Sequence, residues 1–417
     1  MSHRVAVVGG GIIGLSSAYY LAKAGHQVTI IDANQPDADN CSHGNLGLVV
    51  PSHFVPLAAP GVLQYGIKMM FNKRSPFGYH LPPSWQQILW SLRFATKCTH
   101  KHVADSVELL AELNLTSRAL YDELHTEFNQ EFEWMKKGMM ILCIDQKSLD
   151  AEQHEVERAR SLGLDVRMLN KQETAALDPD IEMNMVGCAH YAQDCHLSPT
   201  EFMSAMRRRF PAMGVKEMFG ERIKSITTNI GEVELNTEKG ATYRFDKVVM
   251  AGGYLAGKVR MPNKKKLSIM PGKGYSMTVQ GMKNRPSVPS ILIGARVAIT
   301  PMHGGLRIGG TLEVGNFNDR VDQNRVEGII KSTLQHFPTL EEDKIRATPV
   351  WHGHRPCSPD GLPFIGTDKE DDRIIHASGH SMMGVSLAPV TGMLVAQIAS
   401  REVPSISVEK MSPNRYD

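Results

Sequence analysis

Apolar runs and helical stretches alternate at the start of the chain. Arg4–Val8 (RVAVV) has the run of apolar residues that forms a buried strand. Leu15–Ala24 has a helical composition and ends at Gly25, and Gln27–Ile31 (QVTII) is a second apolar run. This order predicts a strand, a helix and a second, parallel strand, which is how many α/β folds begin.

Similar patterns continue along the rest of the chain. Ser198 followed by Pro199 is typical of a helix N-terminus, and we expect this helix to reach Phe210. Other segments predict helices at 105–130 and Asp150–Leu162, and strands at Gly138–Ile144, Val186–Tyr191, Val215–Ile226 and Val233–Val249. The chain therefore predicts mixed α and β structure throughout.

The composition narrows the class of protein. The chain has 417 residues, and 46 Lys and Arg stand against 44 Asp and Glu, so the net charge is only +2. This near balance disfavours a broadly basic protein that binds nucleic acid. No apolar run reaches the roughly 18 residues that a membrane span needs. The composition also excludes collagen, a disordered chain and a small disulfide-rich scaffold.

The cysteines and the first residues favour a reducing compartment. The six cysteines form no Cys-x-x-Cys pair, and no set of Cys and His has the spacing of a zinc site. His352-Gly353-His354 is at most half of a metal site, so we expect ordinary histidines and no metal. The chain runs straight into its first strand, so we expect no signal peptide and a cytoplasmic protein with free thiols.

A glycine-rich turn follows the first strand and matches G-x-G-x-x-G, and an acid ends the second strand 18 residues after its last glycine. The glycines permit a tight turn and let backbone N–H groups approach a pyrophosphate at a helix N-terminus. The acid can accept hydrogen bonds from both hydroxyls of a ribose, and its charge disfavours a 2′-phosphate such as that of NADP. Because the motif opens the chain, we expect FAD rather than NAD. The expected contacts are Gly9, Gly11, Ile12, Ile13, Gly14 and Asp32.

A polar, glycine-rich loop comes after the second strand. Its small residues and its hydroxyl and amide groups suit a loop that lies along the pyrophosphate and ribityl chain of FAD. An ordinary surface loop is the alternative. We therefore expect further cofactor contacts at Ser42, His43, Asn45, Leu46 and Gly47.

Later segments complete a family pattern. A strand at Lys247–Ala251 runs into Gly252-Gly253, and the chain then carries a Lys-Gly-Tyr-Ser segment at 273–276, an R-P-x-x-P-D-G-x-P-x-I-G block at 355–366 and a G-H-x-x-x-G turn at 379–384. With the S-x-x-N-x-G loop, this order resembles the FAD-dependent D-amino-acid oxidoreductase family over nearly the whole chain. That family includes D-amino-acid dehydrogenase, glycine oxidase and sarcosine oxidase.

The resemblance implies an α/β fold in which a Rossmann-like FAD-binding domain of the D-amino-acid oxidase type joins a mostly antiparallel-sheet substrate domain. The FAD-binding domain of the family is discontinuous. We expect it at residues 1–80, 196–253 and 336–417, and the substrate-binding domain at 81–195 and 254–335.

The resemblance also implies site residues. Arg355 is expected to hold a substrate carboxylate, and Tyr275 either to contact it or to line the pocket. Some glycine oxidase-like members carry an Arg where this chain has Met382, so we expect a partly apolar pocket. In the family the 379–384 turn falls at a helix N-terminus that faces the flavin. The further cofactor contacts expected are Ala251, Gly252, Gly379, His380, Met382, Met383, Gly384 and Val385.

The function that the resemblance implies is oxidation of a D-amino acid at its C–N bond, with hydride transfer to flavin N5. The Lys-Gly-Tyr-Ser and R-P-x-x-P-D-G blocks look most like D-amino-acid dehydrogenase, whereas Leu-Ala-Pro-Val-Thr-Gly at 387–392 looks more like glycine oxidase or hydroxyproline dehydrogenases. The alternatives are a glycine- or sarcosine-type oxidase that makes peroxide, and a flavin subunit of a hetero-oligomeric electron-transfer complex. The expected partners are a small amino acid and an electron acceptor, either a quinone or an electron-transfer protein.

One segment offers a contact surface. Residues 85–94 are rich in aromatic and aliphatic side chains, with Arg93 and Lys97 alongside. Trp and Arg at this density suit a partner subunit or a membrane surface. The alternative is a core helix or the roof of the active site. We therefore also consider an oligomer and peripheral attachment at the inner face of the cell membrane.

Overall fold

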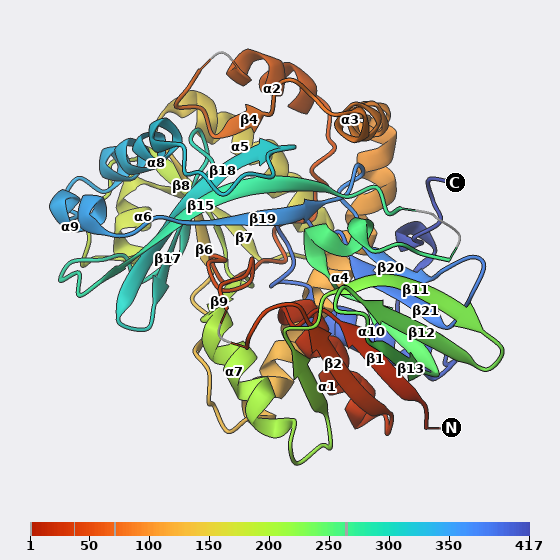
Figure 1. Ribbon diagram of the computed structural model, residues 1–417. Helices are drawn as coiled ribbons and strands as arrows, with labels where there is room; N and C mark the ends of the chain where they lie inside the picture. Colours follow the sequence, from red (N-terminus) through yellow and green to blue (C-terminus); the bar gives the residue numbers. More distant parts are fainter. Residues whose placement is uncertain (1, 37, 71, 263–265) are drawn as a thin grey trace.

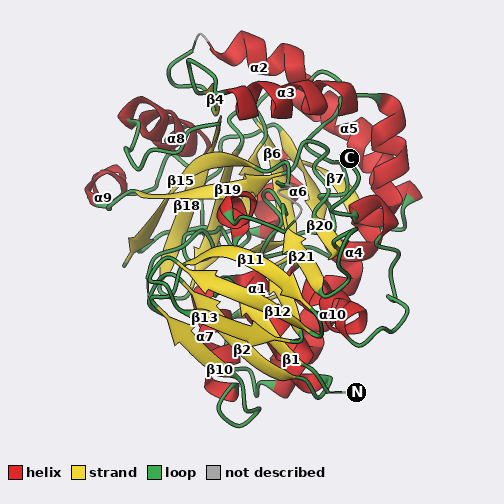
Figure 2. Cartoon of the chain, turned by 45° about the vertical axis from the view of Figure 1, so that its right-hand side comes forward, coloured by secondary structure: helices red, strands yellow, loops and turns green. Residues whose placement is uncertain are grey.

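A computed structural model of the chain describes residues 2–36, 38–70, 72–262 and 266–417. Two large sheets dominate it, a six-stranded sheet near the N-terminus and a nine-stranded sheet beside it (Figure 1). Helices cover one face of the six-stranded sheet, a small three-stranded sheet covers its other face, and further helices pack on the nine-stranded sheet (Figure 2). Among the described residues, no helix is long and apolar enough to cross a membrane.

The six-stranded sheet contains the first predicted elements. Its order is β10-β2-β1-β14-β21-β20, and every neighbouring pair is parallel except β20 with β21. The strands are β1 (Arg4–Val8), β2 (Gln27–Asp32), β10 (Lys216–Phe219), β14 (Lys247–Met250), β20 (Phe364–Thr367) and β21 (Ile374–Ser378). The strand, helix and parallel strand expected at the start of the chain are confirmed, with α1 at Ile12–Lys23.

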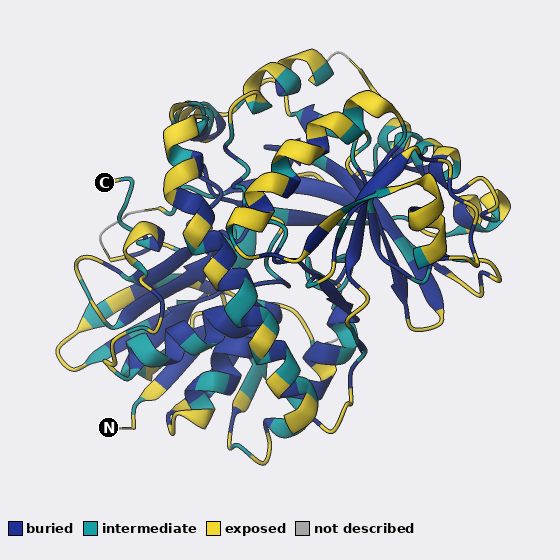
Figure 3. Ribbon diagram, turned by 180° about the vertical axis from the view of Figure 1, so that it is seen from behind, coloured by how far each residue is buried: buried dark blue, intermediate teal, exposed yellow. Residues whose placement is uncertain are grey.

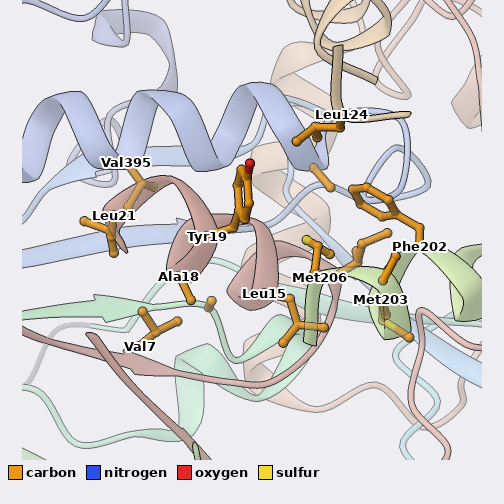
Figure 4. Close-up of a cluster of buried hydrophobic side chains, with 14 of the residues drawn as sticks. Val7, Leu15, Ala18, Tyr19, Leu21, Leu124, Phe202, Met203, Met206 and Val395 are labelled. Atoms are coloured by element: carbon orange, nitrogen blue, oxygen red, sulfur yellow. The ribbon is translucent and has the colours of Figure 1, made fainter. Parts of the chain in front are cut away.

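Both faces of this sheet are covered, because successive strand residues point to opposite faces and both sets are apolar. Val5 and Val7 pack under α1, α4 (His100–Glu127), α7 (Pro199–Arg209) and α10 (Ala388–Ala399). Figure 4 shows this cluster, in which side chains from α1, α4, α7 and α10 gather over Val7. Ala6 and Val8 face a small antiparallel sheet, β11 (Ile223–Asn229), β12 (Glu232–Thr237) and β13 (Thr242–Phe245).

The nine-stranded sheet is mostly antiparallel, as the resemblance implies. Its order is β19-β15-β18-β17-β16-β6-β8-β7, and β4 pairs with β18. The strands are β4 (Phe77–Tyr79), β6 (Met139–Cys143), β7 (Val166–Asn170), β8 (Gly187–Tyr191), β15 (Met270–Gln280), β16 (Ser290–Leu292), β17 (Val297–Met302), β18 (Gly305–Val314) and β19 (Trp351–Cys357).

Several helices pack on this second sheet, and their exposed outer faces contrast with the buried strands in Figure 3. They are α5 (Gln146–Ser161), α6 (Lys171–Leu177), α8 (Gln323–His336) and α9 (Glu342–Ala347), while α2 (Val62–Met70) and α3 (Trp85–Lys97) lie beside β4. The remaining elements are the strands β3 (Leu48–Val49), β5 (Trp134–Met135) and β9 (Cys195–Leu197) and the 3₁₀ helices η1 (Gly253–Lys258) and η2 (Glu409–Met411).

Several elements lie elsewhere than their sequence ranges suggest. Strand β4 and helix α9 fall within ranges expected for the FAD-binding domain, yet β4 pairs with β18 and α9 packs on the nine-stranded sheet. Helix α4 falls within the range expected for the substrate-binding domain, yet Tyr121 and Leu124 belong to the core of the six-stranded sheet. Strand β19 falls within the range expected for the FAD-binding domain, yet it pairs with β15 at the edge of the nine-stranded sheet. The chain therefore crosses between the two sheets more often than the expected boundaries allow.

Candidate cofactor and active site

The glycine turn at residues 9–14 forms a close-fitting cradle. Gly9 has a φ of +118°, and a Cβ on it would lie 2.5 Å from the carbonyl oxygen of Ala251. A Cβ on Gly14 would lie 1.8 Å from the carbonyl oxygen of Gly9. Both positions therefore require glycine. Gly11 is the N-cap of α1 and has no side chain to cap the helix. The N–H of Ile12 donates to Ser42 Oγ, whereas the next N–H groups of the first turn, beginning with that of Ile13, can face an anion.

Asp32 lies beside this turn at the end of β2. Its carboxylate accepts hydrogen bonds from the backbone N–H of Gly10 and, at 2.7 Å, from that of Asn34. The acid is thus held at the mouth of the turn, where the ribose of a bound dinucleotide is expected. The strand–turn–helix–strand–acid arrangement predicted from the sequence is confirmed in its geometry.

The loop at residues 41–47 packs on the start of α1 and on the nine-stranded sheet. Ser42 Oγ accepts a hydrogen bond from the N–H of Ile12 at 3.2 Å, and Ser276 Oγ donates to the carbonyl oxygen of Gly44 at 2.8 Å. Asn45 Oδ1 accepts from the N–H of Gly47 at 2.8 Å. Leu46 and Gly47 lead from the loop into β3, and Gly47 has a φ of +69°.

A buried cation from the second sheet fixes this loop. Arg307 of β18 donates from Nη1 to the carbonyl oxygens of His43, at 2.9 Å, and of Asn45. Burial lowers the pKa of Arg307 to about 10. Because this value is still well above 7, the guanidinium is charged at neutral pH. No motif in the sequence predicts this role. The available signal was a single cation within an otherwise apolar strand, LRIGGTL.

The end of β14 and the turn at residues 379–387 close the other side. Ala251 donates its N–H to the carbonyl oxygen of Val8 at 2.9 Å, and Gly252 follows it directly. His380 is buried beside Thr391 Oγ1 at 2.9 Å, and burial lowers its pKa to about 3, so the ring is neutral. Helix α10 begins only at Ala388. Gly379, Met383, Gly384 and Val385 therefore lie in the turn that precedes the helix rather than at its N-terminus.

These segments line a cavity of about 1310 Å³ between the two sheets. Its lining includes the glycine turn, Asp32, the 41–47 loop, the end of β14 and the 379–387 turn. It continues along an apolar wall formed by α2, β4, α3 and β18, and Met382, which is 44% exposed, lies on its rim. The volume exceeds the usual size of a small-ligand pocket, so it has room for a dinucleotide and a substrate together.

Arg355 and Tyr275 lie on opposite faces of the nine-stranded sheet. Residues directly opposed in an antiparallel pair share a face, and here Gly272 opposes Arg355 while Tyr275 opposes His352. Arg355 lies across Gly274, its Nη1 donates to the carbonyl oxygen of Thr311 at 2.8 Å, and it lines the cavity.

The hydroxyl of Tyr275 points the other way. It donates to Glu313 Oε1 and accepts from the N–H of Asp322 at 3.2 Å, on the side covered by α8. Burial raises the pKa of this phenol above its ordinary range, and the hydrogen bond to Glu313 adds to the rise. Tyr275 is among the residues that line the cavity, but its hydroxyl does not lie beside the Arg355 guanidinium.

Two further polar residues, His53 and Arg296, line the cavity and were not predicted. Burial and the nearby Arg296 lower the pKa of His53 to about 4, so its ring is neutral at pH 7. Ser52 Oγ lies 3.2 Å from His53 Nδ1 and donates to the buried carboxylate of Asp194 at 2.5 Å. No sequence motif connects residues 53, 194 and 296, because only the folded chain brings them together.

The sequence also matches a known family. The model of the DAO family, described as FAD-dependent oxidoreductase, matches residues 4–398. The chain belongs to this family. FAD is therefore its cofactor, and the cradle fits this dinucleotide: its glycines leave no room for a Cβ, the start of α1 faces the cavity, and an acid stands at the ribose position.

Solved structures share the fold of this DAO-family oxidoreductase. Glycine oxidase from Geobacillus kaustophilus matches with a TM-score of 0.78 at 24% identity, covering 99% of both chains. L-Proline dehydrogenase from P. horikoshii matches with a TM-score of 0.74 at 18% identity, covering 100% of this chain and 98% of that one. L-α-Glycerophosphate oxidase from Mycoplasma pneumoniae, with FAD bound, gives 0.73 at 17% identity over 96% and 95%.

Proposed function

We propose that this oxidoreductase oxidises the C–N bond of a D-amino acid whose carboxylate is held by Arg355. The observation that supports this most directly is the Arg355 guanidinium at the cavity wall, oriented by its hydrogen bond to Thr311. A guanidinium can bind a carboxylate through two parallel hydrogen bonds, which fixes the orientation of the substrate as well as its position. The D configuration rests on the resemblance of two motif blocks to D-amino-acid dehydrogenase.

The residues around Arg355 would orient and desolvate the substrate. The apolar wall from α2, α3 and β18 excludes water, which strengthens the ion pair between carboxylate and guanidinium. Positioning of this kind can supply several kcal/mol of the barrier reduction. No dedicated base is needed, since the amine can lose its proton to water before reaction. FAD, when bound in the cradle, would supply the two-electron acceptor for the hydride that leaves Cα.

The product is an imine, because the substrate loses a hydride from Cα and a proton from nitrogen. Water hydrolyses an acyclic imine to a 2-oxo acid and ammonia, whereas a cyclic amine such as proline retains its ring. The apolar wall and Met382 favour substrates with one carboxylate and an uncharged side chain. D-Proline and cis-4-hydroxy-D-proline are therefore included among the proposed substrates.

A second candidate function is a glycine- or sarcosine-type amine oxidase that reduces oxygen to peroxide. The match to the glycine oxidase structure is the observation that favours it. A third is a flavin subunit that passes electrons to partner proteins in a hetero-oligomer. All three functions use the same cofactor site, and they differ in the substrate and in the electron acceptor.

A substrate panel tests the proposal. The purified yellow protein is mixed anaerobically with small and bulky D-amino acids, D-proline, cis-4-hydroxy-D-proline, glycine and sarcosine, and flavin bleaching is followed at about 450 nm. The matched L-amino acids are the controls. We expect bleaching by one or more D-amino acids and turnover with a quinone or dye as acceptor. Bleaching by glycine or sarcosine alone, with peroxide in air, supports the oxidase, and no bleaching by any amine contradicts all amine-oxidising functions.

We also propose that α2 and α3 attach the protein peripherally to an anionic membrane, where a quinone acceptor is available. The large side chains on this surface are exposed: Ile67 by 62%, Leu81 by 62%, Trp85 by 75% and Leu92 by 60%. Residues 40–104 contain no Asp or Glu but carry six cations, Lys68, Lys73, Arg74, Arg93, Lys97 and Lys101. Apolar side chains bordered by cations are typical of proteins that bind anionic lipid surfaces.

A further inference from the structure

Two histidines share one face of the edge strand β19. His352 and His354 are separated by Gly353, and alternate residues of a strand point to the same side. Their side is the one opposite to Arg355, and there the ring of His354 lies 4.9 Å, centroid to centroid, from the ring of Tyr254 in η1. The pair therefore lies where β19 faces η1, on the other side of the strand from the Arg355 guanidinium, and it borders the same cavity.

A third ligating group joins this pair from the loop between β18 and α8. One potential ligand atom each of Asp319, His352 and His354 lie within 4.8 Å of one another. From the sequence alone the two histidines offered only half of a metal site, because Asp319 precedes them by 33 positions and only the fold brings it close.

The loop that carries Asp319 is held on both sides by one buried cation. Lys273 Nζ donates to the carbonyl oxygen and Oδ1 of Asn318, at 3.3 and 3.0 Å, and to the carbonyl oxygen of Arg320 at 2.6 Å. All three donors of the ammonium are thereby used on the residues that flank Asp319. The backbone on either side of the aspartate is therefore held in place, while its side chain is exposed.

The two imidazoles carry nitrogens that have no partner among the described residues. His352 Nδ1 and His354 Nε2 are both buried and accept or donate no hydrogen bond there, and His354 is only 6% exposed. A buried polar atom without a partner is costly, so such atoms in folded proteins commonly mark a bound water or ion. This observation is independent of the clustering of the three side chains.

We propose that Asp319, His352 and His354 form a site for a divalent first-row transition metal ion, with Zn²⁺ as the best match. Two imidazoles and one carboxylate are a typical donor set for Zn²⁺, and three protein ligands leave one position for water. Bonds of about 2.0–2.2 Å place tetrahedral ligand atoms about 3.3–3.6 Å apart, so the site needs a small inward rotation of the exposed Asp319. The ion would tie the 315–322 loop to the edge strand beside η1.

Calorimetric titration of tag-free, FAD-loaded protein with Zn²⁺, after removal of metal by a chelator, tests the site. We expect one Zn²⁺ per chain, and at least ~10-fold weaker binding in Asp319→Asn and in His352→Gln, because loss even of a group that only orients a ligand costs ~10–100-fold. His303→Gln is the matched control, since this histidine is exposed and pairs with Glu201 elsewhere. Its binding should equal that of the wild type.

Co²⁺ provides a spectroscopic check on the same proteins. We expect visible ligand-field absorption in the wild type and in His303→Gln, and its loss in His352→Gln. Tm without metal should match the wild type in all variants, because Asp319 is exposed and His352 half-buried. Flavin content is measured in each variant, because these residues border the cofactor cavity, and metal binding is compared at equal flavin content. No Zn²⁺ binding by the wild type, or equal binding by the wild type and both ligand variants, overturns the proposal.

Discussion

Arg355 and Tyr275 show that the register of two paired strands determines which side chains face the cavity. The sequence suggests both for the substrate pocket, but pairing of β15 with β19 sends their side chains to opposite faces of the sheet. Tyr275 instead joins Glu313 and Asp322 under α8. Arg355 alone of the two presents a charged group to the cavity.

Replacement of Arg355 by Ala should therefore lower kcat/KM and leave the flavin in place. Two hydrogen bonds to a charged group are worth about 1.5–3 kcal/mol each, which corresponds to a loss of ~10²–10⁴-fold. Steady-state kinetics with the best substrate of the panel, beside the flavin absorbance per chain, measures both quantities. Tyr275→Phe is the matched control and should change kcat/KM by only a few fold. Near-wild-type activity of Arg355→Ala contradicts the assignment.

At this scale the cradle glycines and Arg355 were predictable, whereas His53 and Arg307 were not. Gly9 and Gly14 follow from a constraint within one turn, because a Cβ at either position would collide with backbone. His53 and Arg307 act through contacts with residues far along the chain, and no local pattern distinguishes them from other His and Arg residues. The orientation of Tyr275 depends on the register of β15 against β19, which a single sequence does not encode visibly.

At the scale of elements, the 41–47 loop is held more firmly than its composition suggests. Arg307 and Ser276 reach it from the second sheet, and Ser42 contacts the start of α1 from within it. Trp351 packs against Gly44, where a Cβ would lie 2.1 Å from the indole ring. The loop therefore joins the two sheets at the cofactor cavity.

Arg307→Met should weaken FAD binding without unfolding either sheet. The variant keeps an unbranched, flexible stem but loses the hydrogen bonds to the carbonyl oxygens of His43 and Asn45. Each bond from a charged donor contributes about 1.5–3 kcal/mol, so we expect the Kd of FAD to rise at least ~10-fold. Fluorescence titration of the apoprotein with FAD measures this. Arg158→Met, which removes an exposed ion pair on α5, is the control, and an equal Kd in both variants contradicts the role of Arg307.

Element types were predicted better than element partners. The helix starting at Ser198 and Pro199 is confirmed, because its N-cap and N1 residues are local signals. The partners of α4 and β19 depend on which sheet each apolar face meets, and both sheets offer apolar faces. Helix α10 starts later than the family pattern suggests because Ser381, with a φ of +53°, belongs to a tight turn that the sequence does not announce.

At the scale of the whole molecule, residues near the C-terminus brace the R-P-x-x-P-D-G block. Arg415 donates to both carboxylate oxygens of Asp360, at 2.6 and 2.9 Å, and to the carbonyl oxygen of Leu362 at 2.8 Å. Its guanidinium also lies 3.8 Å from the ring centroid of Phe364. This contact ties the end of the chain to the segment that follows Arg355.

The stability that this pair provides should depend on pH. Burial raises the pKa of Asp360, but the hydrogen bonds and charge of Arg415 outweigh burial, so the pKa of the folded protein lies below the ordinary value. The stabilisation is therefore complete above the pKa of an unfolded Asp and is lost as the pH falls through the lower pKa of the folded state. Arg415→Met should cost about 3–5 kcal/mol at pH 7, because it leaves a buried carboxylate unpaired.

Thermal melts of wild type and Arg415→Met from pH 7 to about 3 measure this dependence. We expect the difference in Tm to be large at neutral pH and to shrink with acidification. Arg4→Met removes a more exposed pair with Asp246 and serves as the control. A difference in Tm that is constant with pH would show that Arg415 acts through packing alone.

The exposed apolar side chains and cations of α2 and α3 predict how the whole protein binds lipid vesicles. We expect it to cosediment with phosphatidylglycerol vesicles but not with phosphatidylcholine vesicles, and to be released by salt, because screening weakens contacts between cations and lipid headgroups. Trp85→Ser combined with Leu92→Ser should abolish binding. Ile230→Ser, at a fully exposed position in another part of the molecule, should not. Absence of vesicle binding, or formation of a dimer that the double variant breaks, contradicts the membrane role.

The central strand β14 pairs with β1 on one side and with β21 on the other, so its neighbours come from residues 4–8 and 374–378. During translation, almost the entire chain must be synthesised before the sheet that contains the N-terminal strand can be complete. Contacts this distant in sequence slow folding and leave apolar strands uncovered in the nascent chain. The cofactor cavity also needs the 379–387 turn. We therefore expect FAD to bind only after the ribosome has released that turn, that is, near or after the end of chain synthesis.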